Sequence, residues 1–482
     1  MPCGSAPCCR PARPGPWPRR ASGRCRGHSE NGWDMKLRKA SAGQAVYHDF
    51  IVAPHTSVPA KRLFNCFVVE GPVDPVRLER AIRHAIATHE ALRTSLEDVD
   101  GELTQVIREP SEITEAPMTT VDWDGSLDSV AGIVRGLDNR WTVPRELSMH
   151  VVLGRAPGPR TLVACVLDHA CCDGMSAEIV TDLIRAEYNR PGEEARPDRV
   201  TQFSDYYASM LQDGLETYDD WLRSLESSSP ALPQWMLDRK RPSGEAWTRE
   251  RELSFSDATD ERLRSLSKEY VCTPYEIITA GVGLYFRRAD GAPIRLAVTH
   301  SGRHRRHGFD VVGLLRSQVV DVVDSSRCED VRSFLTARRD ELRRGMTHFG
   351  RLPVEEVCLR AGVSTGWRAG SPGPWEVELN GMYEAPAPEA MDGHEVVPAP
   401  DFLEDAYCEN GGTTFLLNLF LRPERVDATL RYVDPPVSEE MAKRVGADLE
   451  AIVEFLAGDP TRSLAEAPAF FTVAEDFRPL AP

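Results

Sequence analysis

Residues 161–188 read TLVACVLDHACCDGMSAEIVTDLIRAEY, a stretch in which a short segment holding His169 and Asp173 joins two apolar parts. Its first part, Thr161 to Leu167, is an apolar run of strand length. Its last part carries apolar residues at helical spacing, namely Ile179, Val180, Leu183, Ile184 and Tyr188. The stretch therefore predicts a strand, a tight loop and a helix, with His169 at the end of the strand.

The loop between these two elements carries the best candidates for chemistry. A histidine at a strand end can present an imidazole nitrogen of near-neutral pKa, which suits it to take a proton from an amine or a hydroxyl. Asp173 begins the helix and is expected to fix the loop by a salt bridge. Gly174 allows close backbone approach and offers an N–H at a helix N-terminus. By spacing alone, a buried histidine with satisfied hydrogen bonds explains His169 equally well.

Helical and strand-like segments alternate through both halves of the chain and predict an α+β fold. The N-terminal half has a strand at 63–70, a helix begun by Asp74-Pro75, and hairpins at 92–107 and 147–167. The C-terminal half has helices near 258–270, 274–285, 331–342 and 441–456, and strands at 294–299, 319–323, 375–383, 414–421 and 428–433. Residues 384–412 form a long connection, expected to be a lid, a bridge or disordered.

Composition indicates a globular protein with a sizeable core. The chain has 482 residues, of which 41% are hydrophobic and 27% charged, and no apolar window reaches transmembrane length. Its net charge of −17 argues against nucleic acid or an anionic membrane as the main partner.

Residues 1–34 differ in composition from the remainder. They hold six arginines, two acidic residues and four of the twelve cysteines, so the remainder carries a charge of −21. We expect a disordered leader or a mis-assigned start, with Met35 as the initiator. The other cysteines are scattered without a C-x-x-C pair, which favours reduced thiols in the cytoplasm and gives zinc no support.

At this point the chain resembles the condensation domains of nonribosomal peptide synthetases and their free-standing relatives. The family signature His-His-x-x-x-Asp-Gly is matched by Asp168-His-Ala-Cys-Cys-Asp-Gly174. Five further motifs fall in the family's order, at 41–44, 89–94, 203–207, 301–303 with 312–313, and 431–432. The resemblance covers about residues 36–465.

The resemblance implies a chloramphenicol-acetyltransferase-like fold with two lobes forming a V around a channel. Residues 35–195 would form the N-terminal lobe and 196–470 the C-terminal lobe, with 384–412 as a bridging loop and 471–482 as a tail. His169 would be the catalytic base or a positioning group, and the backbone N–H of Gly174 would face the developing oxyanion. Asp173 would pair with Arg303. No metal and no bound cofactor are implied.

The sequence departs from the family pattern in two places. Asp168 replaces the first histidine, and because neighbouring strand residues face opposite ways we interpret it as structural. The segment Val312-Gly-Leu-Leu-Arg-Ser317 loses the family's Phe and Asn and gains Arg316. Cys172, Arg316 and Ser317 are therefore the candidates for lining the substrate channel, although packing is favoured over a thiol nucleophile or metal ligand for Cys172.

A second catalytic motif is present but lacks its context. Gly362-Val-Ser-Thr-Gly366 matches the nucleophile elbow of serine hydrolases. The strand before it and the helix after it are missing from the pattern, since residues 371–374 are rich in Gly and Pro. We therefore do not interpret it as a hydrolase site.

Three classes of function follow from the resemblance. The first is a free-standing condensation enzyme of natural-product or antibiotic biosynthesis, because no adenylation segment, carrier attachment serine or thioesterase is seen. It would join an acyl or aminoacyl group, carried on the phosphopantetheine of an acyl or peptidyl carrier protein, to a small amine or alcohol. The second is an acyltransferase using acyl-coenzyme A or a polyketide carrier, and the third a non-catalytic recruitment protein. We expect a cytoplasmic monomer.

Overall fold

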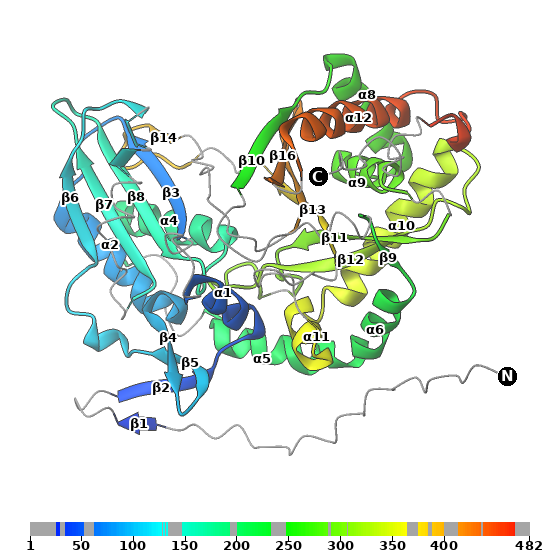
Figure 1. The fold of residues 1–482 in the computed structure, drawn as a ribbon. Coiled ribbons are helices and arrows are strands. Elements are labelled where there is room, and N and C mark those ends of the chain that lie inside the picture. Colours follow the sequence, from blue (N-terminus) through cyan, green and yellow to red (C-terminus); the bar gives the residue numbers. More distant parts are fainter. Residues whose placement is uncertain are drawn as a thin grey trace, which may run out of the picture.

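The computed structural model describes residues 26–28, 34–52, 62–127, 129–130, 132–133, 147–192, 200–232, 247–287, 291–305, 307–363, 375–383, 388–399, 413–434 and 437–467. These residues form two lobes that lie side by side (Figure 1). Both lobes combine a β-sheet with helices, so the expected α+β architecture is present.

The N-terminal lobe is built on a five-stranded sheet in the order β14-β3-β8-β7-β6. Its strands are β3 (Arg62–Val69), β6 (Met118–Asp122), β7 (Met149–Arg155), β8 (Thr161–Asp168) and β14 (Val396–Pro398). Only the β6–β7 pair among these is parallel. Helices α2 (Pro75–Thr88) and α4 (Gly174–Asn189) pack on each other and share a core with this sheet. Strand β14 lies within the connection 384–412 and brings that segment to the edge of the N-terminal sheet.

A smaller sheet in the order β1-β2-β5-β4 corrects one expectation about the leader. Its strands are β1 (Arg26–His28), β2 (Asp34–Lys39), β4 (Thr94–Val99) and β5 (Glu102–Ile107). Strand β1 falls within residues 1–34, which we expected to stand outside the fold, and it pairs antiparallel with β2. This pairing departs from the disordered-leader expectation at residues 26–28 only, because backbone pairing does not depend on side-chain hydrophobicity. The rest of the leader before β2 lies outside the described residues.

The C-terminal lobe is built on a larger sheet in the order β10-β16-β15-β13-β11-β12, with β9 paired to β11. Its strands are β9 (Ser229–Pro230), β10 (Trp247–Leu253), β11 (Ile294–His300), β12 (Ser317–Val323), β13 (Val377–Tyr383), β15 (Phe415–Leu421) and β16 (Val426–Asp434). The helices are α8 (Asp257–Tyr270), α9 (Pro274–Tyr285), α10 (Val331–Phe349), α11 (Val354–Ala361) and α12 (Glu439–Ala457). Helix α9 is buried from Tyr275 to Tyr285.

Local sequence chemistry explains where the main helices begin. The Asp74 side chain accepts the N–H groups of Val76 and Arg77, and Pro75 supplies the fixed φ of a first helical residue. At α9, Thr273 and Glu276 form a reciprocal capping box, and the residue after Thr273 is again a proline at the first helical position. Each of these signals lies within four residues, which is why the helix starts were predictable.

Two of the described helices contact both lobes. Helix α1 (Ala42–Val52) contacts α11 of the C-terminal lobe. Helix α5 (Phe203–Gly214) is followed by α6 (Tyr218–Glu226). The expected boundary at 195/196 assigns α5 to the C-terminal lobe, yet its buried Phe203 and Met210 join the apolar cluster of the N-terminal sheet. The expected boundary rests on a polar segment near residue 195 that lies outside the described residues, whereas the packing of α5 is set by its apolar face.

Two buried histidines of the N-terminal lobe predict a loss of stability in mild acid. Burial, and to a smaller extent the nearby charge of Arg93, lowers the pKa of His89 to about 4. Burial and, to a smaller extent, the charge of Arg62 lower the pKa of His150 to about 4. In the unfolded chain both have a pKa near 6.5, so below that pH the unfolded state binds protons that the folded state refuses. By pH 5 each histidine should cost roughly 2 kcal/mol of stability.

The measurement is the urea midpoint of the protein at pH 7.5 and pH 5.0, compared with that of His150→Asn. The drop should be smaller in the variant by roughly 2 kcal/mol, the contribution of His150 alone, whatever its stability at pH 7.5. An unchanged drop in the variant would show that His150 is not held neutral by the fold.

Candidate active site

The loop that carries His169 is organised around the end of strand β8. The backbone carbonyl of Asp168 accepts the N–H groups of Cys171 at 3.0 Å and Cys172 at 2.9 Å. Its carboxylate accepts the N–H of Ala170 at 2.8 Å, and burial raises the pKa of that carboxyl. Asp168 therefore closes the turn through its own backbone and side chain.

His169 is held in one orientation by that turn. Its Nδ1 lies 2.9 Å from the carbonyl oxygen of Cys172, and since a carbonyl only accepts, Nδ1 carries the hydrogen. This leaves the lone pair on Nε2, the form needed to accept a proton. The ring of Tyr47, from helix α1, lies against the imidazole with a centroid distance of 4.7 Å. His169 itself is partly exposed, so its side chain is not sealed in the core.

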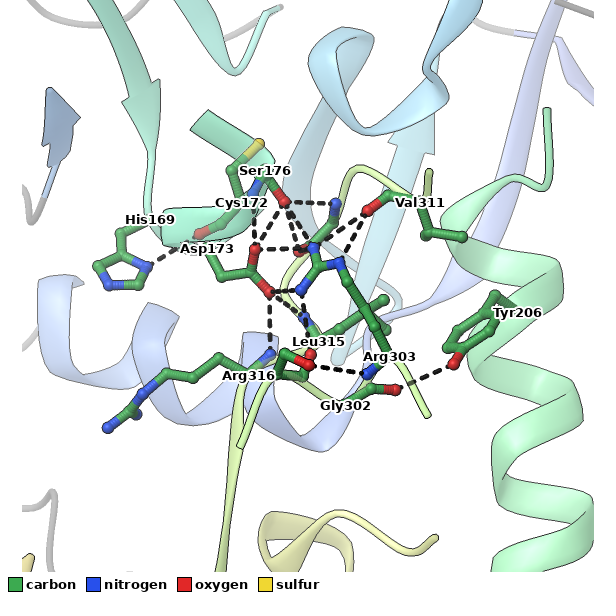
Figure 2. Close-up of polar contacts among 12 residues, drawn as sticks. His169, Cys172, Asp173, Ser176, Tyr206, Gly302, Arg303, Val311, Leu315 and Arg316 are labelled. Atoms are coloured by element: carbon green, nitrogen blue, oxygen red, sulfur yellow. Dashed lines mark hydrogen bonds and ion pairs between the residues drawn. The ribbon is translucent and has the colours of Figure 1, made fainter. Parts of the chain in front are cut away.

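Asp173 caps helix α4 and forms a buried ion pair with Arg303 (Figure 2). Both oxygens of the carboxylate accept from the guanidinium, at 2.8 Å each, and neither side chain is more than 2% exposed. Burial alone would raise the pKa of Asp173, but Arg303 and the hydrogen bonds of Ser176 hold it below its ordinary value. The pair that the resemblance implied is present, and it is ionised.

The same two residues join the lobes through a network of backbone contacts. Asp173 accepts the N–H groups of Leu315 and Arg316 at 2.9 Å, and Arg303 donates to the carbonyl of Val311 at 3.0 Å. Gly302 precedes Arg303 with φ of +69°, and a Cβ there would lie 2.1 Å from the carbonyl oxygen of Leu315. Glycine is therefore required for Arg303 to enter this packed site.

Gly174 is the first residue of helix α4 and is exposed. A Cβ added to it would meet no atom of the described structure within 4 Å. The backbone N–H groups of a first helical turn are unpaired within the helix and carry partial positive charge. The combination of an open approach and an N–H donor is suited to an oxygen that gains negative charge.

The three channel candidates have different surroundings, and two of these predictions are wrong. Cys172 is fully buried in the core of the N-terminal lobe, and burial raises the pKa of its thiol. Ser317 is also buried, where it donates to Glu355 at 2.7 Å and accepts the N–H of Val354 at 3.1 Å. Neither side chain has a surface on which a substrate could lie. The turn and the strand register, which local spacing does not reveal, direct both side chains inward.

Arg316 is the candidate that remains partly exposed. Its guanidinium forms an ion pair with Glu378 of strand β13 and donates to Thr299 at 3.4 Å. It also lies 3.5 Å from the hydroxyl of Tyr47. The structure thus brings Arg316 to the side of the site on which Tyr47 meets His169.

Tyr47 and Glu378 were missed in the sequence. Glu378 did carry a signal, because a carboxylate that lies between Val377 and Leu379 in a strand must find a partner if it is buried. Tyr47 follows the motif at 41–44 but carries no local mark of its own, and only the packing of α1 against the loop reveals it.

Metal and membrane sites are not seen in the described ranges. No cluster of three or more His, Cys, Asp or Glu side chains there could hold a metal ion. Within the same ranges, no helix is both long and apolar enough to cross a membrane. The serine of the elbow-like motif, Ser364, lies outside the described residues.

Curated relatives with detectable similarity are much longer than this chain. It is 26% identical over 272 residues to nonribosomal peptide synthetase agiA of Aspergillus flavus, covering 51% of this chain and 3% of that protein. It is 22% identical over 318 residues to tyrocidine synthase 2 of Brevibacillus parabrevis, covering 64% of this chain and 8% of that protein. The chain thus spans a small fraction of the length of these relatives.

Solved structures share the fold over most of their length. The condensation domain of the monacolin K polyketide synthase MokA matches with a TM-score of 0.70 and 16% identity, covering 89% of this chain and 99% of that one. The X-domain from teicoplanin biosynthesis matches with a TM-score of 0.71 and 17% identity, and the match covers 89% of this chain and 97% of that one. The starter condensation domain of rhizomide synthetase, in a complex with C8-CoA, matches with a TM-score of 0.67 and 16% identity. This match covers 89% of this chain and 97% of that one.

These likenesses confirm the predicted α+β fold of chloramphenicol-acetyltransferase type, with two lobes meeting at the loop of His169. The family model described as the condensation domain matches residues 62–359, more than half of the chain, including both His169 and Arg303. A match of that extent across both lobes shows that this chain belongs to the condensation-domain family.

Proposed function

We propose that this protein joins an acyl or aminoacyl group, carried as a thioester on the phosphopantetheine of a carrier protein, to an amine or hydroxyl nucleophile. The observation that carries the proposal is the fixed tautomer of His169, which leaves Nε2 as a proton acceptor beside the first turn of α4. Membership of the condensation-domain family supports this reaction class.

The proposed reaction follows from this geometry. Nε2 of His169 takes the proton as the nucleophile attacks the thioester carbonyl, forming the new C–N or C–O bond. The carbonyl oxygen gains negative charge, which the N–H of Gly174 stabilises. When the tetrahedral intermediate collapses, the C–S bond breaks and His169 returns the proton to the departing thiolate. The products are an amide or ester and the free phosphopantetheine thiol.

The test is a reconstituted assay read by intact mass. The protein is incubated with acylated carrier proteins and a panel of amines and alcohols, and loss of acyl mass from the carrier is followed together with product formation. A parallel series offers the same acyl groups on coenzyme A. Transfer from the carrier supports the proposal, and transfer from coenzyme A alone supports the acyltransferase alternative. Absence of both, while a carrier or another protein still binds, supports the recruitment alternative that Asp168 keeps open.

The same proposal includes the setting of the reaction. We propose a cytoplasmic monomer acting in natural-product or antibiotic biosynthesis, since carrier-bound intermediates and reduced, buried cysteines belong to that compartment. Size-exclusion chromatography with light scattering tests the monomeric state.

Gly174→Ala separates the proposed oxyanion role from a structural one. The added methyl meets no atom of the protein within 4 Å, so the melting temperature should stay close to that of the parent protein. The methyl would stand where the substrate carbonyl approaches, and we expect kcat/KM to fall about 100-fold, the lower end of the range for loss of one oxyanion contact. Unchanged turnover would remove Gly174 from the site.

A further inference from the structure

We infer that Arg316 is a substrate-selecting residue, whose guanidinium holds a carboxylate on one of the two condensing substrates next to His169. The inference rests on the proposed function for the identity of those substrates. It is carried by the way in which Glu378, Tyr47 and Asp173 place one partly exposed guanidinium beside the reacting group.

Glu378 is the buried anchor of this arrangement. Its carboxylate is 3% exposed and accepts from Thr299 at 2.8 Å and from Gln318 at 3.1 Å, in addition to its ion pair with Arg316. These additional hydrogen bonds hold the Glu378 carboxylate in place inside the C-terminal lobe. In this ion pair the carboxylate of Glu378 is buried, whereas the guanidinium of Arg316 is partly exposed.

Arg316 is the partly exposed member of this ion pair. Its side chain is 20% exposed, and the contacts to Glu378 and Thr299 both use Nη2. The longer contact to Tyr47 uses Nη1, so the guanidinium has N–H groups beyond those engaged. Burial would lower the pKa of Arg316, but Tyr47 and Glu378 raise it above its ordinary value, so the group is always charged.

Two contacts place this charge relative to His169. The backbone N–H of Arg316 donates to Asp173, four residues after the histidine, and Tyr47 touches both the imidazole and the guanidinium. In Figure 2 the side chains of His169 and Arg316 extend to the same side of the Asp173–Arg303 pair. A substrate whose reacting atom meets His169 would therefore have a neighbouring group within reach of Arg316.

A carboxylate is the group that this site fits. The guanidinium carries a full positive charge and keeps N–H groups on Nε and Nη1 that can each donate to a carboxylate oxygen, and such a contact is stronger away from bulk water. The carboxylate could belong to the acceptor, as in an amino acid that is not attached to a carrier. It could equally belong to the donor, as in an acyl group with a second, free carboxyl. The shared chemistry is the same, and the test separates the two sources.

The test compares matched pairs of substrates that differ only at the carboxyl. For the acceptor, the pairs are free amino acids and their amides. For the donor, the pairs are glutaryl and valeryl groups on carrier protein or coenzyme A. Two variants are used, because Arg316→Leu leaves Glu378 buried without its partner and could unfold the site. Arg316→Met combined with Glu378→Gln removes both charges while Gln keeps a hydrogen-bonding side chain. Arg305→Leu, an arginine of the same lobe that pairs with Asp213, is the matched control.

The expected result is a preference for the carboxylate member in one of the two arms. That preference should fall about 30-fold in the double variant and stay unchanged in Arg305→Leu. The ratio within each pair is compared between proteins, so the different intrinsic reactivity of acid and amide cancels. Turnover with an unchanged ratio in both arms would overturn the inference while leaving the proposed function in place.

A binding readout keeps the two proposals distinguishable. Calorimetry with the same pairs is run on His169→Ala, with and without the Arg316 and Glu378 changes. Tighter binding of the carboxylate member, lost with Arg316, supports the inference even where no transfer is seen. Equal binding of both members by His169→Ala would overturn it.

Discussion

Exchange of Arg303 for leucine is expected to lower the stability of the protein by about 3–5 kcal/mol. The change would leave the carboxylate of Asp173 buried at the junction of the lobes without its counter-ion. The hydrogen bonds from Ser176, Leu315 and Arg316 would remain but cannot replace a full charge. The measurement is the midpoint of urea unfolding together with the melting temperature.

A double-mutant cycle tests whether the cost comes from the uncompensated charge. Asp173→Leu should be about as harmful as Arg303→Leu, and the double variant should cost clearly less than the sum, because it buries no lone charge. Arg305→Leu is the control, since its ion pair with Asp213 is partly exposed, unlike the Asp173–Arg303 pair, and should contribute no more than about 1 kcal/mol. Additive effects of the two buried changes would contradict the ion-pair account.

Exchange of His169 for alanine is expected to reduce kcat/KM for acyl transfer by roughly 100- to 10,000-fold. The proton acceptor Nε2 is lost, while Asp173, Arg303 and Gly174 keep their positions because the ion pair and the cap of α4 are formed by other groups. The melting temperature should therefore stay close to that of the parent protein. The measurement is the rate of acyl loss from the carrier at saturating and at limiting acceptor.

Two comparisons show whether that loss is specific to the site. His348→Ala removes a partly exposed histidine of α10 that pairs with Asp220, and it should leave transfer unchanged. His169→Gln keeps a polar side chain but no base of suitable pKa, and it should remain as slow as His169→Ala. If His169→Ala turns over as fast as the parent protein, the catalytic assignment is wrong.

Local signals account for the elements that were predicted correctly. The apolar run after Thr161 forms strand β8, the periodic residues from Ile179 onward form α4, and Asp173 caps that helix. Each of these features depends on residues a few positions apart, through strand alternation, helical periodicity or a single capping hydrogen bond. The resemblance added the partner of Asp173, which no local pattern contains.

The errors share a different cause. Cys172 and Ser317 belong to the correct segments, but the direction of a side chain within a turn or at the start of a strand depends on the register of its partners. Strand β1 joins a sheet through backbone pairing, and α5 packs on a lobe that precedes it in the chain. Composition and hydropathy report none of these relations.

For this protein, the sequence by itself determined the strand, loop and helix that place His169 at a strand end, because those elements depend on contacts within one short stretch of chain. Only the tertiary structure decided what surrounds the histidine. Tyr47 and Glu378 come from elements far apart in the sequence, and their side chains meet Arg316 because α1 and β13 pack at the junction of the lobes. Burial and long-range pairing set those contacts, and they depend on how the whole chain packs.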